Sequence, residues 1–241
     1  MNRNLWLLAL CQGLLLTNNV AFIAINGLVG LSLAPFAWMA TLPVMGYVVG
    51  GALSTPLVAR TQSRYGRRTS FQIGLAVAFA SVCAAAWAVA DKNFWLLVAA
   101  TVVAGYYSAN GQLYRFAAAE LVPVPQRERA VSLVLAGGLL GAIAGPNLAA
   151  RSRSLLDVPF AGAYVVLAGV ALLAMVLMAF VRFPPHVSAS AGANSGRPLS
   201  EIMRQPVFVV ACISAALGYG VMNLLMAATP LAMQQCGLSF D

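Results

Sequence analysis

The chain has 241 residues, of which 61% are hydrophobic and 8% are charged, and its formal net charge is +8. So little charge leaves too little polar surface for a soluble fold. The arginines stand at the ends of apolar stretches rather than in a polar region with interleaved aromatic residues, so the positive charge favours membrane topology over nucleic-acid binding. The composition therefore predicts an all-α polytopic membrane protein with the lipid bilayer, and no nucleic acid, as partner.

Seven apolar stretches are long enough to cross a bilayer, which takes about 20 helical residues. The predicted spans cover residues 5–30, 36–59, 70–90, 94–117, 130–150, 160–182 and 206–233. We expect the first six to form an N-terminal transmembrane bundle, residues 1–182. A flexible linker, residues 183–205, should follow, with a short surface helix near Ser200. The seventh span, within residues 206–241, would begin a second, incomplete bundle.

The basic residues predict the orientation of these spans. One set of alternate connectors holds only Lys92, Arg151 and Arg153. The other set holds Arg3, Arg60, Arg64, Arg67, Arg68, Arg127, Arg129, Arg182, Arg197 and Arg204. Because Lys and Arg accumulate on the cytoplasmic side, we expect a cytoplasmic N-terminus and a cytoplasmic linker. The compact loops favour a bacterial inner membrane.

The connector predicted between the second and third spans reads ARTQSRYGRRT, residues 59–69. Its residues Arg64, Gly66, Arg67 and Arg68 resemble the cytoplasmic loop motif of the major facilitator superfamily, Gly-x-x-x-Asp-Arg-x-Gly-Arg-Arg. In that family the motif latches helix ends together through charge pairs, but here Ser63 occupies the acidic position. A plain cluster of cytoplasmic basic residues is the alternative interpretation.

The fifth predicted span gives a second resemblance. Gly141, Gly145 and Pro146 match the Gly-x-x-x-Gly-Pro core of the fifth-helix motif of the same family, which is often associated with antiporters. Glycines four residues apart also let a neighbouring helix approach closely, so a general packing face is the alternative. Together with the connector at residues 117–133, these motifs resemble the family over nearly the whole chain. The resemblance implies a truncated 12-helix carrier: an N-terminal six-helix bundle plus the seventh helix.

Polar side chains inside spans are costly and usually face a cavity or another helix. In the family, helices one, four and seven resemble cavity-lining elements. We therefore expect the substrate path to be lined by Asn19, Phe22, Asn26, Tyr106, Tyr107, Asn110, Tyr114 and Asn223. Asn19 and Asn223 also superpose when the first and seventh spans are aligned. Hydrogen bonding between helices is the alternative role for each amide.

Arg115 is the only basic residue predicted near the interior of a span. It would bind an anionic group of the substrate, extend its side chain to the lipid headgroups, or pair with Glu120. All six acidic residues lie in connectors or at span ends, so no buried carboxylate is visible as a proton relay.

The sequence thus predicts a secondary carrier that moves a small organic solute by alternating access. The amide and aromatic residues favour a neutral or amphipathic ring-bearing solute, by uptake or efflux. We expect the chain to be a fragment that is inactive until the missing C-terminal half completes it. The alternative is a membrane scaffold or regulatory fragment that pairs with a full-length relative. Enzyme chemistry, a cofactor and a metal site find no support, since His186 has no Cys or acidic neighbour at ligand spacing.

Overall fold

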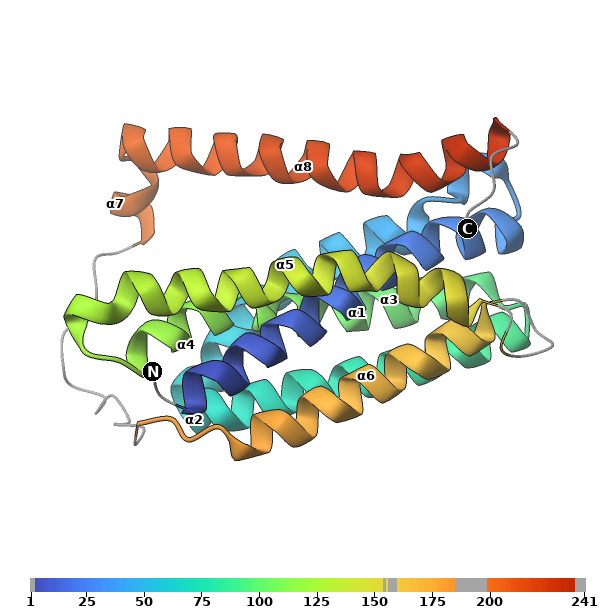
Figure 1. Cartoon of the computed structure of the whole chain (residues 1–241). Helices are drawn as coiled ribbons and strands as arrows, with labels where there is room; N and C mark the ends of the chain where they lie inside the picture. Colours follow the sequence, from blue (N-terminus) through green and yellow to red (C-terminus); the bar gives the residue numbers. More distant parts are fainter. Residues whose placement is uncertain (1–2, 154, 156–159, 185–198, 237–241) are drawn as a thin grey trace.

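A computed structural model describes residues 3–153, 155, 160–184 and 199–236, and every regular element within them is helical. The helices are α1 (Arg3–Leu33), α2 (Leu42–Ala90), α3 (Phe94–Gly111), α4 (Tyr114–Glu120), α5 (Arg127–Ser152), α6 (Ala161–Phe180), α7 (Leu199–Met203) and α8 (Pro206–Gln235). Short 3-10 helices cover Ala37–Met39 and Val124–Gln126. α1 to α6 form a bundle and α8 lies along one side of it (Figure 1). The predicted all-α class is confirmed, and α7 is the short helix expected near Ser200.

Five helical segments of the described chain are long and apolar enough to cross a membrane. They are Arg3–Leu33, Ala37–Ala90, Val124–Ser152, Ala161–Phe180 and Pro206–Met226. The helices α1, α5, α6 and α8 agree with the predicted first, fifth, sixth and seventh spans to within three residues at each end. The second and third spans need separate description because they belong to one helical segment.

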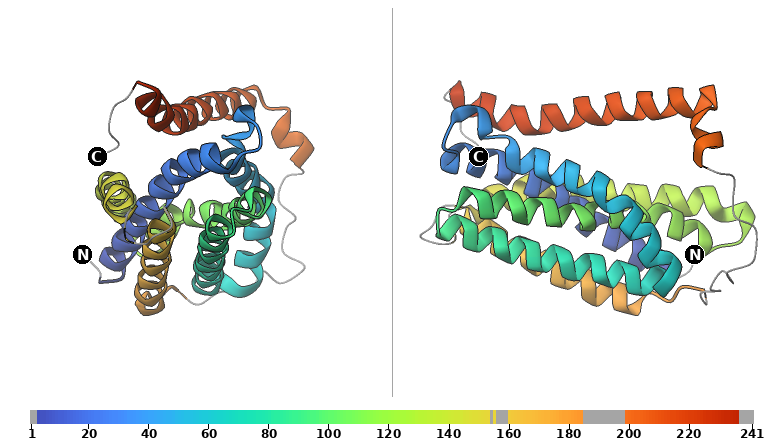
Figure 2. Two further views of the ribbon diagram at one scale, coloured as in Figure 1. Left: turned by 90° about the vertical axis from the view of Figure 1, so that its right-hand side faces the viewer. Right: turned by 180° about the vertical axis from the view of Figure 1, so that it is seen from behind.

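α2 contains both the second and the third predicted spans. Gly66 interrupts it with φ 79° and ψ 171°, a conformation that residues with a Cβ atom rarely adopt. The chain reverses there, so the two limbs of α2 run in opposite directions (Figure 2). The predicted connector over residues 59–69 contains this reversal, and its residues are helical on both sides of Gly66.

The fourth predicted span, residues 94–117, is broken in the structure. α3 begins at a cap in which the Asn93 side chain accepts a hydrogen bond from the Leu96 amide, 3.0 Å away. It ends at Gly111, where the Leu113 amide donates to the Asn110 carbonyl at 3.1 Å and tightens the last turn. α4 then starts separately. The prediction of one continuous helix is therefore wrong, because apolar composition alone did not indicate this turn.

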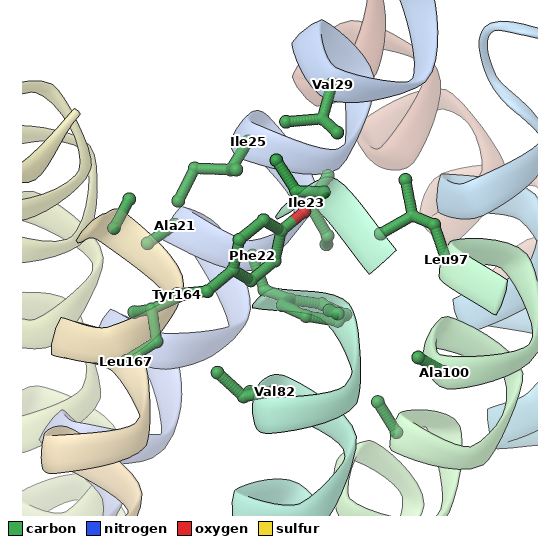
Figure 3. Packing of buried hydrophobic residues seen from close by; sticks show 14 of the residues in the cluster. Ala21, Phe22, Ile23, Ile25, Val29, Val82, Leu97, Ala100, Tyr164 and Leu167 are labelled. Carbon is green, nitrogen blue, oxygen red and sulfur yellow. The ribbon is translucent and has the colours of Figure 1, made fainter. Parts of the chain in front are cut away.

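α1 lies at the centre of the bundle and contacts α2, α5 and α6. Figure 3 shows Phe22 of α1 packed among apolar side chains from several helices, including Val82 of α2, Leu97 of α3 and Leu167 of α6. In lipid, such contacts depend on close packing, because the hydrocarbon outside the protein is as apolar as the core. The burial of α1 makes its polar side chains the natural place to look for a site.

The helix ends that carry most of the arginines meet at one end of the bundle. The start of α1, the Gly66 turn, the start of α5 and the end of α6 all lie there (Figure 1). The Asn4 amide donates to the Arg182 carbonyl at 3.0 Å, and the Arg182 amide donates to Asn4 Oδ1 at 3.4 Å. These bonds join the first and last residues of the six-helix bundle. We call this region the arginine-rich end.

Candidate substrate path

An aromatic cluster occupies the middle of the bundle. The Phe22 ring of α1 lies 5.3 Å from the Tyr47 ring of α2 and 6.1 Å from the Tyr164 ring of α6, both edge to face. Asn18, Phe22, Tyr47 and Tyr107 line a narrow gap that has no room for a water molecule. The space between these four side chains is therefore too narrow for a solute in this conformation.

Three of the predicted path residues have buried oxygens without a hydrogen-bond partner in the described part of the chain. They are Asn19 Oδ1, Tyr107 Oη and Asn223 Oδ1. Gln12 Oε1 and Ser81 Oγ share this condition. An unpaired buried polar atom costs about 1–3 kcal/mol, so such atoms are rare unless a ligand or water satisfies them.

Asn26 and Asn110, in contrast, are hydrogen-bonded within the protein. Tyr164 Oη donates to Asn26 Oδ1 at 2.9 Å, which ties α6 to α1. Asn110 Nδ2 donates to the Ser70 carbonyl at 2.7 Å, which ties α3 to the second limb of α2. Asn26 Nδ2 donates to the Phe22 carbonyl of the same helix at 2.7 Å, and Asn110 Oδ1 accepts from Gln62 Nε2 at 3.2 Å. These contacts agree with hydrogen bonding, the alternative role stated from the sequence.

The remaining predicted path residues are dispersed. Tyr106 Oη donates to Thr61 Oγ1 at 3.1 Å, and the Tyr114 ring packs edge to face on Phe71 at 4.7 Å. Arg115 is exposed, with its guanidinium 5.0 Å from the Phe116 ring centre. The structure does not bring these three residues together with Asn19.

Tyr47 and Asn18 were not among the predicted path residues, although both line the central gap. Tyr47 is 3% exposed in an otherwise apolar stretch of α2, and Asn18 Nδ2 donates to the Leu167 carbonyl at 3.1 Å. The rule that selects polar residues inside apolar spans applies to both. Restricting that rule to the first, fourth and seventh spans left Tyr47 out.

The loop-motif residues form a network at the arginine-rich end. Arg67 binds Glu120 at the end of α4 with two bonds, Nη2 to Oε1 at 2.6 Å and Nε to Oε2 at 3.2 Å. Arg67 also donates to Gln62 Oε1. Arg68 Nη2 donates to the Ala179 carbonyl at 2.6 Å, in the last turn of α6. Charge pairing across helix ends is therefore present, with its acid supplied by α4.

The same contacts decide one alternative for Arg115. Glu120 binds Arg67, so the pairing of Arg115 with Glu120 is wrong. Two other motif residues contact near neighbours in the sequence: Ser63 Oγ donates to the Arg60 carbonyl at 2.9 Å, and the Arg64 guanidinium lies 5.5 Å from the Tyr65 ring centre. Arg67 and Arg68 join different helix ends.

The glycines of the fifth-helix motif pack α5 against α1. A Cβ added at Gly141 would lie 1.9 Å from the Gly13 carbonyl oxygen, so only hydrogen fits there. Thr17 Oγ1 donates to the Gly141 carbonyl at 3.1 Å. Gly145 is likewise buried, and Pro146 lies inside the continuous helix. The close helix approach predicted from the glycine spacing is present, and it fixes the position of the α1 segment that carries Asn19.

No group of three or more His, Cys, Asp or Glu residues that could hold a metal ion occurs in the described ranges. The predicted exclusion of His186 from a metal site falls outside those residues.

Comparisons with known proteins agree with this arrangement. The family model described as Major Facilitator Superfamily matches residues 5–241. The chain is 34% identical over 241 residues to the riboflavin transporter RfnT of Brucella anthropi, a match that covers 99% of this chain and 61% of that protein. It is 24% identical over 214 residues to the uncharacterised MFS-type transporter YddS of Bacillus subtilis, covering 83% and 49% of the two chains.

The fold is also that of a solved transporter. The crystal structure of a D-xylose-proton symporter matches 98% of this chain and 63% of its own chain, with a TM-score of 0.68 and 18% identity. The chain therefore spans between about half and two thirds of the length of these three proteins. The agreement of family model, relatives and fold shows that this integral membrane protein belongs to the Major Facilitator Superfamily.

Proposed function

We propose that the chain is part of a secondary carrier that moves a small ring-bearing organic solute by alternating access. The observation that carries this proposal is the set of unpaired buried oxygens of Asn19, Tyr107 and Asn223, of which Tyr107 lines the gap beside Phe22 and Tyr47. Amide and phenol groups can donate to and accept from polar ring edges, while the aromatic rings pack on ring faces. A simple ion would need neither feature.

The 34% identity to a riboflavin transporter supports a fused-ring vitamin as the solute class. A flavin presents carbonyl and N–H groups along one edge of an extended aromatic system, which matches the chemistry of the proposed path. The gap between Phe22 and Tyr107 is too narrow for a water molecule, so entry of such a solute requires the helices around it to move apart. That movement is what an alternating-access carrier provides.

The orientation follows from the arginine-rich end. We place this end, the N-terminus and the linker at residues 183–205 in the cytoplasm of a bacterium, because basic residues accumulate on that side of the inner membrane. Residues 1–182 then form the first transmembrane bundle, and residues 206–241 begin a second one.

The exposure of α8 supports a requirement for further protein. Val207, Ile213 and Leu217 of α8 are each more than half exposed, and only 6% of the most apolar window of this helix is buried. We propose that the chain alone does not transport and that the rest of the carrier covers α8. The same surface favours a second candidate function, a regulatory fragment that pairs with a full-length relative. Co-purification of this chain with a second, longer chain, in a complex that shows no uptake activity, would favour that candidate.

Uptake of radiolabelled riboflavin by riboflavin-auxotrophic cells tests the carrier function. The complete carrier that contains this sequence should restore uptake, and Asn19→Ala and Tyr107→Phe should each lower it about tenfold, the loss expected for one hydrogen bond to the solute. Tyr65→Phe is the matched control, because Tyr65 is exposed and remote from the aromatic cluster. Unchanged uptake in both path variants, at equal amounts of membrane-inserted protein, would remove this site assignment.

A further inference from the structure

A second pocket with different chemistry lies at the arginine-rich end, away from the aromatic cluster. It has a volume of about 490 Å³ and is lined by Arg3, Asn4, Arg68, Ala179, Phe180 and Arg182. The three arginines come from three parts of the chain: the first turn of α1, the second limb of α2 and the residues that follow α6. Figure 2 shows these helix ends close together at one end of the bundle. An even distribution of surface charge would not place three arginines around one pocket.

The charge in this pocket is not neutralised within the described part of the chain. None of the described residues that line it is acidic. The one ion pair that the described residues form, between Arg67 and Glu120, belongs to the neighbouring network and uses neither Arg3, Arg68 nor Arg182. Three guanidinium groups around one space therefore favour an anion, and phosphate geometry suits their paired N–H donors.

The pocket is also held in place by the fold. Arg68 Nη2 donates to the Ala179 carbonyl at 2.6 Å, which fixes its guanidinium at the C-terminal end of α6. A guanidinium has five N–H donors, so this bond leaves donors for a ligand. The Asn4 side chain donates to the Arg182 carbonyl at 3.0 Å and accepts from the Arg182 amide at 3.4 Å. Both bonds use the backbone of Arg182, so its side chain takes no part in them. A ligand would therefore meet a site whose backbone is already ordered.

An apolar surface continues from this pocket along the bundle. Phe180, which lines the pocket, is 57% exposed, and Val176 and Leu173 follow at 54% and 50% exposed. These positions lie four and seven residues before Phe180, so they share one face of α6. A free phosphate ion would make no use of such a surface. The acyl chains of a phospholipid would lie against it while the headgroup occupies the pocket.

We infer that Arg3, Arg68 and Arg182 bind the phosphate headgroup of an anionic phospholipid, with its chains along the Phe180 face of α6. This site goes beyond solute transport, because it lies apart from the aromatic cluster and engages the membrane itself. Basic pockets between transmembrane helices are suited to anionic headgroups, and each arginine near the phosphate adds about fivefold in affinity.

Native mass spectrometry of the detergent-solubilised chain tests the site. Titration with dioleoylphosphatidylglycerol should give a saturable one-to-one adduct, and dioleoylphosphatidylcholine should bind at least about tenfold more weakly. The triple variant R3Q/R68Q/R182Q should lose the adduct. Arg182→Gln alone should weaken binding about fivefold, and it keeps the fold because only the Arg182 backbone contacts Asn4.

A charge-matched control separates a site from general attraction. R60Q/R127Q/R204Q removes the same charge from exposed arginines that the sequence places on the same side and that line none of the pockets described here. It should change phosphatidylglycerol binding less than twofold. Equal losses in the two triple variants, equal binding of the two lipids, or displacement of the lipid by millimolar inorganic phosphate would each overturn the inference. The first outcome would indicate diffuse electrostatics, and the last a soluble anion.

Discussion

α1 and α8 are similar as sequences and opposite as structures. Both are long apolar helices with an Asn near the middle, Asn19 and Asn223. In α1, 72% of the most apolar window is buried, whereas in α8 the value is 6%. α1 is surrounded by α2, α5 and α6. The main contact of α8 with the described bundle is with α1. Hydropathy therefore indicates that a helix resides in the membrane but not what covers it.

The difference lies in how each helix meets its neighbours. α1 is packed through glycines on α5 and through side-chain hydrogen bonds from Thr17 and Asn18 to carbonyls of α5 and α6. Gly218 and Gly220 of α8 have open space around them. Close backbone approach and polar contacts, rather than apolar area, hold helices together in lipid. α8 has the composition of a packed helix without these contacts.

Thiol labelling should show the largest contrast between the two helices. Cys11 of α1 is buried, whereas Cys212 of α8 is exposed. In detergent we expect a fluorogenic maleimide to label Cys212 at least about 100-fold faster than Cys11, which must wait for local opening of the bundle. Exposed Cys83 of α2 is the internal control. Slow labelling of Cys212 with fast labelling of Cys83 would break the comparison, because it would mean that α8 is covered.

Matched glycine substitutions should show the next largest effect. Gly141→Ala places a methyl group 1.9 Å from the Gly13 carbonyl oxygen, so α1 and α5 must separate, and we expect a loss of about 3 kcal/mol in the free energy of unfolding. Gly218→Ala meets nothing within 4 Å and should change it by less than about 1 kcal/mol. Unfolding in mixed micelles, followed by circular dichroism, measures both. Equal losses would show that α8 packs as tightly as α5.

Removing single polar groups should give the smallest contrast. Tyr164→Phe deletes the donor to Asn26 Oδ1 and leaves that buried oxygen unpaired, which should cost about 1.5 kcal/mol in the same unfolding assay. Asn223→Ala removes an oxygen that lacks a partner together with the Nδ2 bond to the Tyr219 carbonyl of the same helix, two effects of opposite sign, and should change stability by less than about 0.5 kcal/mol. A large loss in the second variant would mean that Asn223 Oδ1 has a partner in the folded protein.

Much of the fold could be predicted because helix length and apolar runs set the spans. The bounds of α5 and α6 follow from this signal, and Gly141 predicts the helix contact because its spacing limits what can pack there. The reversal at Gly66 and the break before α4 could not be predicted in this way. The first is a change at one residue and the second a turn at Gln112 and Leu113, both within helical sequence, so hydropathy averaged over a window does not detect them.

The sequence indicated which types of residue to expect at the candidate site, but not which partner each residue would have. Asn19 and Asn26 lie seven residues apart on one helix and read alike in the sequence. The structure separates them, because Tyr164 of α6 reaches Asn26 and not Asn19. Likewise, Glu120 reads as a neighbour of Arg115 but binds Arg67, 53 residues away. Such pairings depend on which helices meet, which a single sequence does not state.

The bonds between Asn4 and Arg182 have a consequence for how larger proteins can be assembled from this bundle. They bring together residues 178 positions apart, so the chain leaves the bundle next to the place where it entered. A unit whose ends coincide can be duplicated in tandem with a short connector, and each copy starts on the side of the membrane where the previous copy stopped. The same closure predicts that a circularly permuted gene, cut at another exposed connection and joined across residues 4 and 182, still encodes this bundle.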